Sequence, residues 1–137
     1  MTIAEAKELL LMHSFAYSDV DHPKMKSGFL GSLRPFSGHL NEQNYHEVMA
    51  ALLVLAPSLE QPVVDREVVR SLWGICHLAR AWGVYPDGML RSNGLIQPAD
   101  VERLDGWIEH ISYATMVLLD GGGIDVAFEF YDNPTAA

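Results

Sequence analysis

The chain has 137 residues, with 18 acidic and nine basic side chains and a formal net charge of −9 at neutral pH. A chain of this length forms one ordinary domain with its own hydrophobic core. The negative charge repels nucleic-acid phosphates, and no stretch approaches the roughly 20 apolar residues of a membrane span. We therefore expect a globular domain that binds neither nucleic acid nor membrane.

The cysteine content and the N-terminal residues predict a cytoplasmic location. Cys76 is the only cysteine, so the chain cannot form an internal disulfide, and a reducing compartment is the simplest interpretation. Glu5 and Lys7 precede the first apolar cluster, whereas a secretory signal has a basic start followed by an uninterrupted apolar run.

The first segment predicts a helix over residues 3–17. Thr2 and Glu5 have the spacing of a capping box, and apolar residues then recur on one helical face. His13 falls in the middle of that face. We favour a core histidine that is hydrogen-bonded to a carbonyl, and the alternative is a ligand or catalytic histidine.

Residues 18–40 form a long connection without helical periodicity, interrupted by glycines and prolines. A connection of this length inside a compact domain is usually functional, or else its secondary structure has been wrongly assigned. Its apolar residues indicate that it packs onto the body of the domain. If a pocket lies between this segment and the helices, its candidate lining residues are His13, Phe29, Phe36 and His39.

The middle of the chain predicts two further helices, over 42–56 and 65–82. Pro57 should end the first, because the residue before a proline resists helical geometry. Asp65 can begin the second, and Gly83 lies where a left-handed C-terminal cap belongs.

A fourth helix is expected over 98–119, with Pro98 in its first turn. From Ile111 onward this helix is apolar on nearly all sides, so we expect its C-terminal half to be central. Four main helices, two long connections and no strand pattern predict an all-α bundle. The single domain should span 1–132, with a short helix or docked segment near its end and a frayed tail at 133–137.

The stretch "SLWGICHLARAWG", residues 71–83, places Cys76 beside His77. Neighbours on a helix point about 100° apart, so these two side chains diverge and do not form a catalytic dyad. The chain also lacks a nucleophile elbow, a phosphate loop and the ligand spacing of a zinc site. We predict no catalytic residue, metal or cofactor, although an enzyme with an unfamiliar site stays an alternative.

The side of this helix that faces away from the core carries Arg70, Trp73, Gly74, His77, Arg80 and Ala81, which we call the outer strip. Tryptophan and arginine are enriched at binding hot spots, so Arg70, Trp73, His77 and Arg80 are candidate partner-binding residues. One interpretation is that the outer strip packs against the 18–40 segment or the C-terminal segment. The other is that it is an exposed surface for a protein partner or a homodimer.

The negative charge is concentrated in residues 83–137, which hold nine acids and only two bases. Such a field favours a cationic partner. A small, acidic, helical domain without catalytic motifs resembles bacterial immunity and antitoxin-like proteins in general type, although no motif carries the likeness. The leading hypothesis is a non-enzymatic protein-binding module, immunity- or antitoxin-like or regulatory, with a basic partner. The alternative is a small-molecule-binding domain or an enzyme with a pocket beside the 18–40 segment.

Overall fold

The computed structural model describes residues 1–134, and the regular secondary structure in this range is helical, without a strand. The elements are α1 (Ile3–His13), α2 (Lys24–Ser27), α3 (Glu42–Leu59), α4 (Arg66–Ala79), the π-helical turn η1 (Arg80–Val84), α5 (Met89–Ser92), α6 (Pro98–Leu119) and α7 (Ile124–Ala127). The all-α prediction is confirmed, including the short helix after the fourth main one. Residues 135–137, the end of the tail predicted to fray, lie outside the described range. No helix within residues 1–134 is both long and apolar enough to cross a bilayer.

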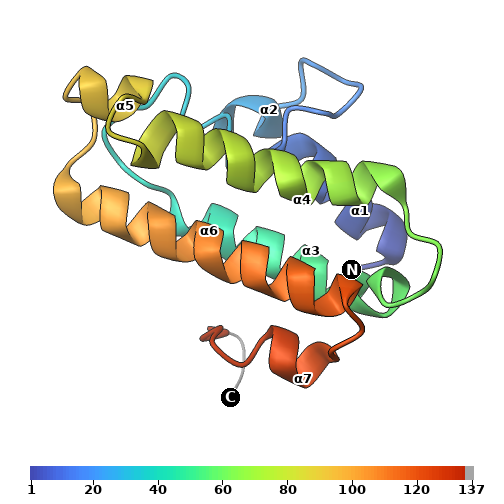
Figure 1. Cartoon of the computed structure of the whole chain (residues 1–137). Coiled ribbons are helices and arrows are strands. Elements are labelled where there is room, and N and C mark those ends of the chain that lie inside the picture. Colours follow the sequence, from blue (N-terminus) through green and yellow to red (C-terminus); the bar gives the residue numbers. More distant parts are fainter. Residues whose placement is uncertain (135–137) are drawn as a thin grey trace.

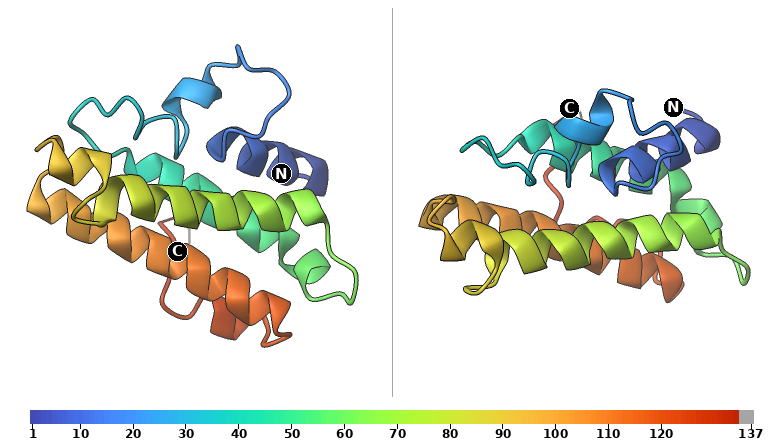
Figure 2. Two further views of the ribbon diagram at one scale, coloured as in Figure 1. Left: turned by 45° about the horizontal axis from the view of Figure 1, so that its top comes forward. Right: turned by 90° about the horizontal axis from the view of Figure 1, so that it is seen from above.

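The long helices form two layers. Helices α4 and α6 make one layer, and α1 and α3 make the other behind it (Figures 1 and 2). The core between them consists of fully buried aliphatic side chains such as Leu10, Leu52, Leu72, Ile75, Ile108 and Ile111. The 18–40 segment, with α2, belongs to the α1–α3 side, whereas α7 follows α6 and packs beside it. The outer face of the α4–α6 layer therefore lies opposite the side where the long connection packs.

The predicted helix starts are confirmed by their caps. The capping box of Thr2 and Glu5 is complete in both directions. The side chains of Asn41 and Asp65 accept hydrogen bonds from backbone amides in the first turns of α3 and α4. Pro98 is the first residue of α6, where its missing amide hydrogen costs nothing.

The first predicted helix is too long, because α1 ends at His13 instead of residue 17. Two residues after the end of α1, Phe15 adopts a left-handed φ of 61°, which the helix cannot accommodate. This turn brings the Phe15 ring to 6.2 Å from the ring of Trp82. The local strain of the left-handed residue accompanies a tertiary contact that the helical pattern does not encode.

The second predicted helix is too short, because α3 passes through Pro57 and ends at Leu59. Proline inside a helix removes one backbone hydrogen bond and crowds the carbonyl four residues earlier, so Pro57 disfavours continuation of α3. The extra turn buries Leu59, which is 2% exposed, against the core. Burial of this leucine outweighs the proline signal.

The third predicted helix is continuous, but it changes from an α-helix to a π-helical turn, since α4 ends at Ala79 and η1 follows. Gly83 is therefore not a left-handed cap, and its φ is not positive. A Cβ atom at Gly83 would lie 2.5 Å from Cδ2 of Leu104. The glycine is needed for close approach to α6, so the predicted capping role is wrong.

His13 is fully buried and ties the 18–40 segment to the α1–α3 layer. Its Nδ1 accepts a 2.8 Å hydrogen bond from the amide of Phe29. The Nε2 proton can then be donated to Glu47, whose Oε1 lies at 3.0 Å. Lys24 Nζ donates to the same oxygen at 2.7 Å. The hydrogen bond from His13, aided by Lys24, lowers the pKa of Glu47 to about 2.

The pocket expected between the 18–40 segment and the helices is not formed at its candidate residues. His13 is saturated by the bonds above, and Phe29 is buried edge-on against Trp107 with ring centroids 6.4 Å apart. His39 is exposed and Phe36 is half-buried. The cavity bordered by Phe29 and Trp107 measures about 10 Å³, which is room for one water molecule at most.

Candidate functional site: the α4–α6 groove

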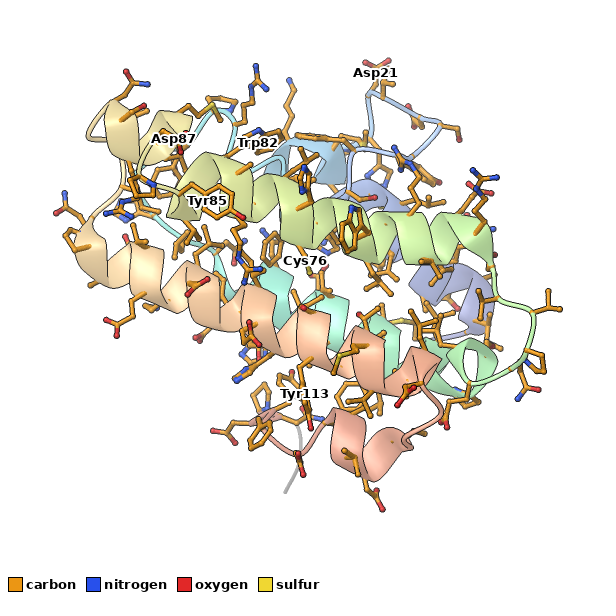
Figure 3. The ribbon with its side chains drawn as sticks, viewed as in Figure 1. Asp21, Cys76, Trp82, Tyr85, Asp87 and Tyr113 are labelled. Atoms are coloured by element: carbon orange, nitrogen blue, oxygen red, sulfur yellow. The ribbon has the colours of Figure 1, made fainter. Side chains whose placement is uncertain are left out.

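A groove of about 980 Å³ lies along the outer face of the α4–α6 layer. Figure 3 looks onto this face, with Cys76 between the two helices and Tyr85 beyond the end of α4. The side chains and backbone that line it come from α4, α6 and the turns that follow each of them. They are Val69, Leu72, Trp73, Cys76, His77, Arg80, Tyr85, Ser112, Thr115, Met116, Val117, Leu119, Asp120, Gly122 and Val126.

The two helices run antiparallel and are joined across the groove at one end. The Cys76 thiol donates to the carbonyl of Ile108 at a long 3.9 Å. Arg80 reaches across to the carboxylates of Asp105 at 3.4 Å and Glu109 at 3.6 Å. These contacts fix which residues of α4 lie opposite which residues of α6.

Toward the other end of the groove, the α6 wall is built from small and apolar side chains. Ser112 and Thr115 occupy little volume, and the Thr115 hydroxyl is turned back to the Ile111 carbonyl at 2.7 Å. Small side chains on this wall leave space between the two helices. Aliphatic residues such as Leu72 and Val117 make much of the lining apolar, and the Thr115 hydroxyl is turned away to the backbone.

The rim of the groove is unusually apolar for a surface. Trp73 is 72% exposed and Met116 is 59% exposed, and Tyr85, Leu119 and Val126 are also exposed. The Trp73 indole stacks on His77 of its own helix, with ring centroids 6.3 Å apart and planes 9° apart. Contiguous apolar surface of this kind marks an interaction site more often than a monomer surface.

No segment within residues 1–134 packs over the exposed part of the outer strip, so the interpretation that the 18–40 segment or the described C-terminal segment covers it is wrong. Arg70, Trp73 and His77 are exposed, and a Cβ atom added at Gly74 would meet nothing within 4 Å. Arg80 is half-buried through its ion pairs with α6. The structure thus places three of the four candidate partner-binding residues at the groove, while Arg70 lies on the outward face beside it.

Sequence reasoning missed the α6 half of the groove. The apolar run after Ile111 led to the expectation that this part of α6 is central, and that is wrong for Met116 and Leu119. The apolar run itself was a signal for the groove. In a two-layer fold one face of each helix packs on the core, so a helix that is apolar on all sides leaves an apolar face exposed. Tyr85 and Val126, in irregular or short elements, gave no comparable signal.

The groove has little of what catalysis requires. Burial raises the pKa of the Cys76 thiol to about 12, so the thiol stays protonated and unreactive. His77 stacks on the outward-facing Trp73, whereas the Cys76 thiol is directed to the Ile108 carbonyl, so the two side chains diverge as their adjacency on a helix predicts. Among the described residues, no group of three histidines, cysteines or acids could hold a metal ion. The geometry supports binding of an apolar group.

The two rims of the groove carry opposite charges. On α4 the exposed Arg66 and Arg70 have no ion pair within the described range. On α6 the exposed acids Glu102, Asp105 and Glu109 and the C-cap residue Asp120 share one side of the helix, whereas the exposed Arg103 lies toward α3, where it pairs with Glu42. Any occupant therefore meets a basic edge on one side and an acidic edge on the other.

Protein-family models, curated proteins and solved structures were each compared with this chain, and none of them matches it. No relative therefore indicates a substrate, cofactor or partner. The role of the groove has to be inferred from its shape, its apolar rim and its charges.

Proposed function

We propose that the protein is a non-enzymatic protein-binding module whose α4–α6 groove takes an apolar segment of its partner. The observation that carries this proposal is Trp73, which stands 72% exposed on the rim of an apolar groove of about 980 Å³. Tryptophan is among the residues that contribute most to binding energy when a partner desolvates it. A solvent-exposed tryptophan that binds nothing lowers solubility and adds no packing energy to the fold.

The charge of the groove supports a partner with cationic groups on the α6 side. Within residues 1–134, Glu102 and Asp120 form no ion pair, and Asp105 and Glu109 share a single arginine. An attraction between exposed charges weakens as salt screens it. An immunity- or antitoxin-like role with a basic toxin or effector is one form of this proposal. The lone, protonated Cys76 fits a reducing compartment such as the cytoplasm.

The proposal is tested by comparing what three immobilised proteins capture from an extract of the source cells. They are the wild type, Trp73→Ala and the control Leu53→Ala, which removes a half-exposed leucine from α3 in the other layer. We expect proteins that bind the wild type and the control, are lost with Trp73→Ala, and are released by added salt. Identical sets from all three proteins would contradict the proposal.

A small-molecule-binding domain is the second candidate, now located at this groove instead of beside the 18–40 segment. The volume of about 980 Å³ lies at the upper end of typical ligand pockets. Native mass spectrometry of the purified protein tests this candidate. A bound small molecule that disappears in Trp73→Ala would favour it over a protein partner.

A further inference from the structure

The outward faces of α4 and α6 form two parallel ridges, one basic and one acidic. Residues four and three apart share a helix face, so Arg66, Arg70, Trp73 and His77 make up the α4 ridge. Glu109, Met116 and Asp120 make up the facing part of the α6 ridge. Each ridge thus holds charges of one sign and one large exposed apolar side chain, Trp73 on α4 and Met116 on α6.

The contacts across the groove give the alignment of the two ridges. Cys76 lies opposite Ile108, and the helices are antiparallel. Since each residue advances a helix by about 1.5 Å, ten residues back along α4 reach Arg66. An equal distance forward along α6 reaches its C-terminal end, next to Asp120. The free cation of α4 and the free anion of α6 therefore lie at the same level along the groove.

We propose that the partner of this groove is a second copy of the chain, related by a two-fold axis that runs along the groove. This inference rests on the proposed function and names the partner. A rotation about that axis places α4 of each copy on α6 of the other, so basic ridges meet acidic ridges. A two-fold axis across the groove would instead place α4 on α4 and bring like charges together. The charge pattern selects the first arrangement, which is self-complementary as a symmetric dimer requires.

The arrangement assigns a contact to each exposed group of the ridges. Arg66 of one copy lies at the level of Asp120 of the second copy. Trp73 lies about one and a half turns along the groove from Met116 of the second copy, and His77 lies within about 3 Å of the level of Glu109. Trp73 of each molecule then closes the groove of the other, and the outer strip of each copy is covered by the second copy.

Sedimentation velocity over a dilution series tests the inference with the purified full chain and five variants. They are Trp73→Ala, Arg66→Glu, Asp120→Arg, the double variant Arg66→Glu/Asp120→Arg, and the control Asp21→Arg. Asp21 lies on the 18–40 segment, far from α6 (Figure 3). Far-UV circular dichroism confirms that each variant is folded.

We expect a monomer–dimer equilibrium for the wild type and an unchanged one for Asp21→Arg. Trp73→Ala should weaken the dimer about thirtyfold, as loss of a hot-spot tryptophan does. Arg66→Glu and Asp120→Arg should each weaken it about tenfold, through like-charge contacts. The double variant restores opposite charges and should recover most of the lost affinity.

A wild type that stays monomeric at every concentration would overturn the dimer. So would a dimer that ignores Trp73→Ala, or a double variant no better than its single parents. If the wild type is monomeric while Trp73→Ala still loses captured proteins, the second copy is wrong as the partner and the groove function stands. If Trp73→Ala changes neither dimer nor capture, the proposed function itself fails.

Discussion

Trp73 and Trp82 stand on one continuous helical stretch, α4 and η1, but their surroundings are opposite. The Trp82 ring packs on Phe15 at 6.2 Å and lies under the guanidinium of Arg34 at 5.4 Å. Among the described residues, the one ring that Trp73 stacks on is that of His77 from its own helix. Trp82 faces the 18–40 side of the molecule (Figure 3), whereas Trp73 lines the α4–α6 groove.

The difference shows what the long connection is for. Residues 18–40 cover one side of the helices. The hydrogen bonds of His13 to Phe29 and Glu47 anchor this segment. No described segment does the same for the α4–α6 face. Within the described residues, the fold therefore has one face that a long connection covers, which we call the completed face, and one face that is left open to solvent.

The largest effect should come from removing the anchor of the completed face. His13→Ala leaves the Phe29 amide and part of the Glu47 carboxylate without their partner in a buried site. We expect the free energy of unfolding to fall by about 3 kcal/mol, measured by urea denaturation. His39→Ala, in the same segment but exposed, is the matched control and should change it by less than about 0.5 kcal/mol. Equal effects of the two variants would contradict the anchoring role.

The two tryptophans themselves provide the next comparison. Trp82→Ala removes packing against Phe15 and the cation–π contact with Arg34, so we expect a loss of about 2 kcal/mol in unfolding free energy. Trp73→Ala should cost less than about 0.5 kcal/mol, because the indole is mostly in water. Both values come from the same denaturation series. A large loss for Trp73 would mean that its face is covered within the chain.

Acid should weaken the completed face through Glu47. Because His13 and Lys24 lower its pKa from an ordinary 4.5 to about 2, the ionised carboxylate stabilises the folded state above pH 4.5. That contribution is lost as the pH falls from 4.5 toward 2. Glu47→Gln should flatten the stability profile in this window and leave the acid dependence of other carboxylates. A profile as steep as that of the wild type would count against the network.

Two glycines on the same helical stretch give the smallest effects, with opposite signs. Gly83→Ala forces a Cβ atom against Leu104 in the core and should destabilise the fold by about 1 kcal/mol. Gly74→Ala adds a methyl group to open space in α4 and should stabilise the fold by about 0.5 to 1 kcal/mol. Thermal unfolding of both variants measures the pair. Destabilisation by Gly74→Ala would place another segment on the outer strip.

The helices were predictable where local signals decide their ends. Pro98 and the glycines after Leu119 bound α6, and its predicted range of 98–119 is confirmed. Local signals failed where tertiary packing decides, since Phe15 leaves the helix to reach Trp82 and α3 runs past Pro57 to bury Leu59. Gly83 looked like a cap because sequence cannot show how closely α6 approaches.

The site was half predictable for a similar reason. The periodicity of α4 identified the outer strip, including Trp73, because a helix face can be read from spacing alone. Whether a helix face is covered depends on the path of the connecting segments. The path of residues 18–40 cannot be predicted from local sequence patterns. Two of the four residues expected to line a pocket there, His13 and Phe29, form the anchor instead, and the groove lies where two uncovered helix faces meet.

Hydroxyl-radical footprinting of dilute wild-type protein tests the central claim most directly, because it measures solvent access of each tryptophan in one experiment. The uncovered α4–α6 face predicts that Trp73 is oxidised fastest, the half-buried Trp82 more slowly, and Trp107, which is 8% exposed, slowest. If Trp73 is oxidised no faster than Trp82, the outer strip is covered within the chain and the account of an open binding face is wrong.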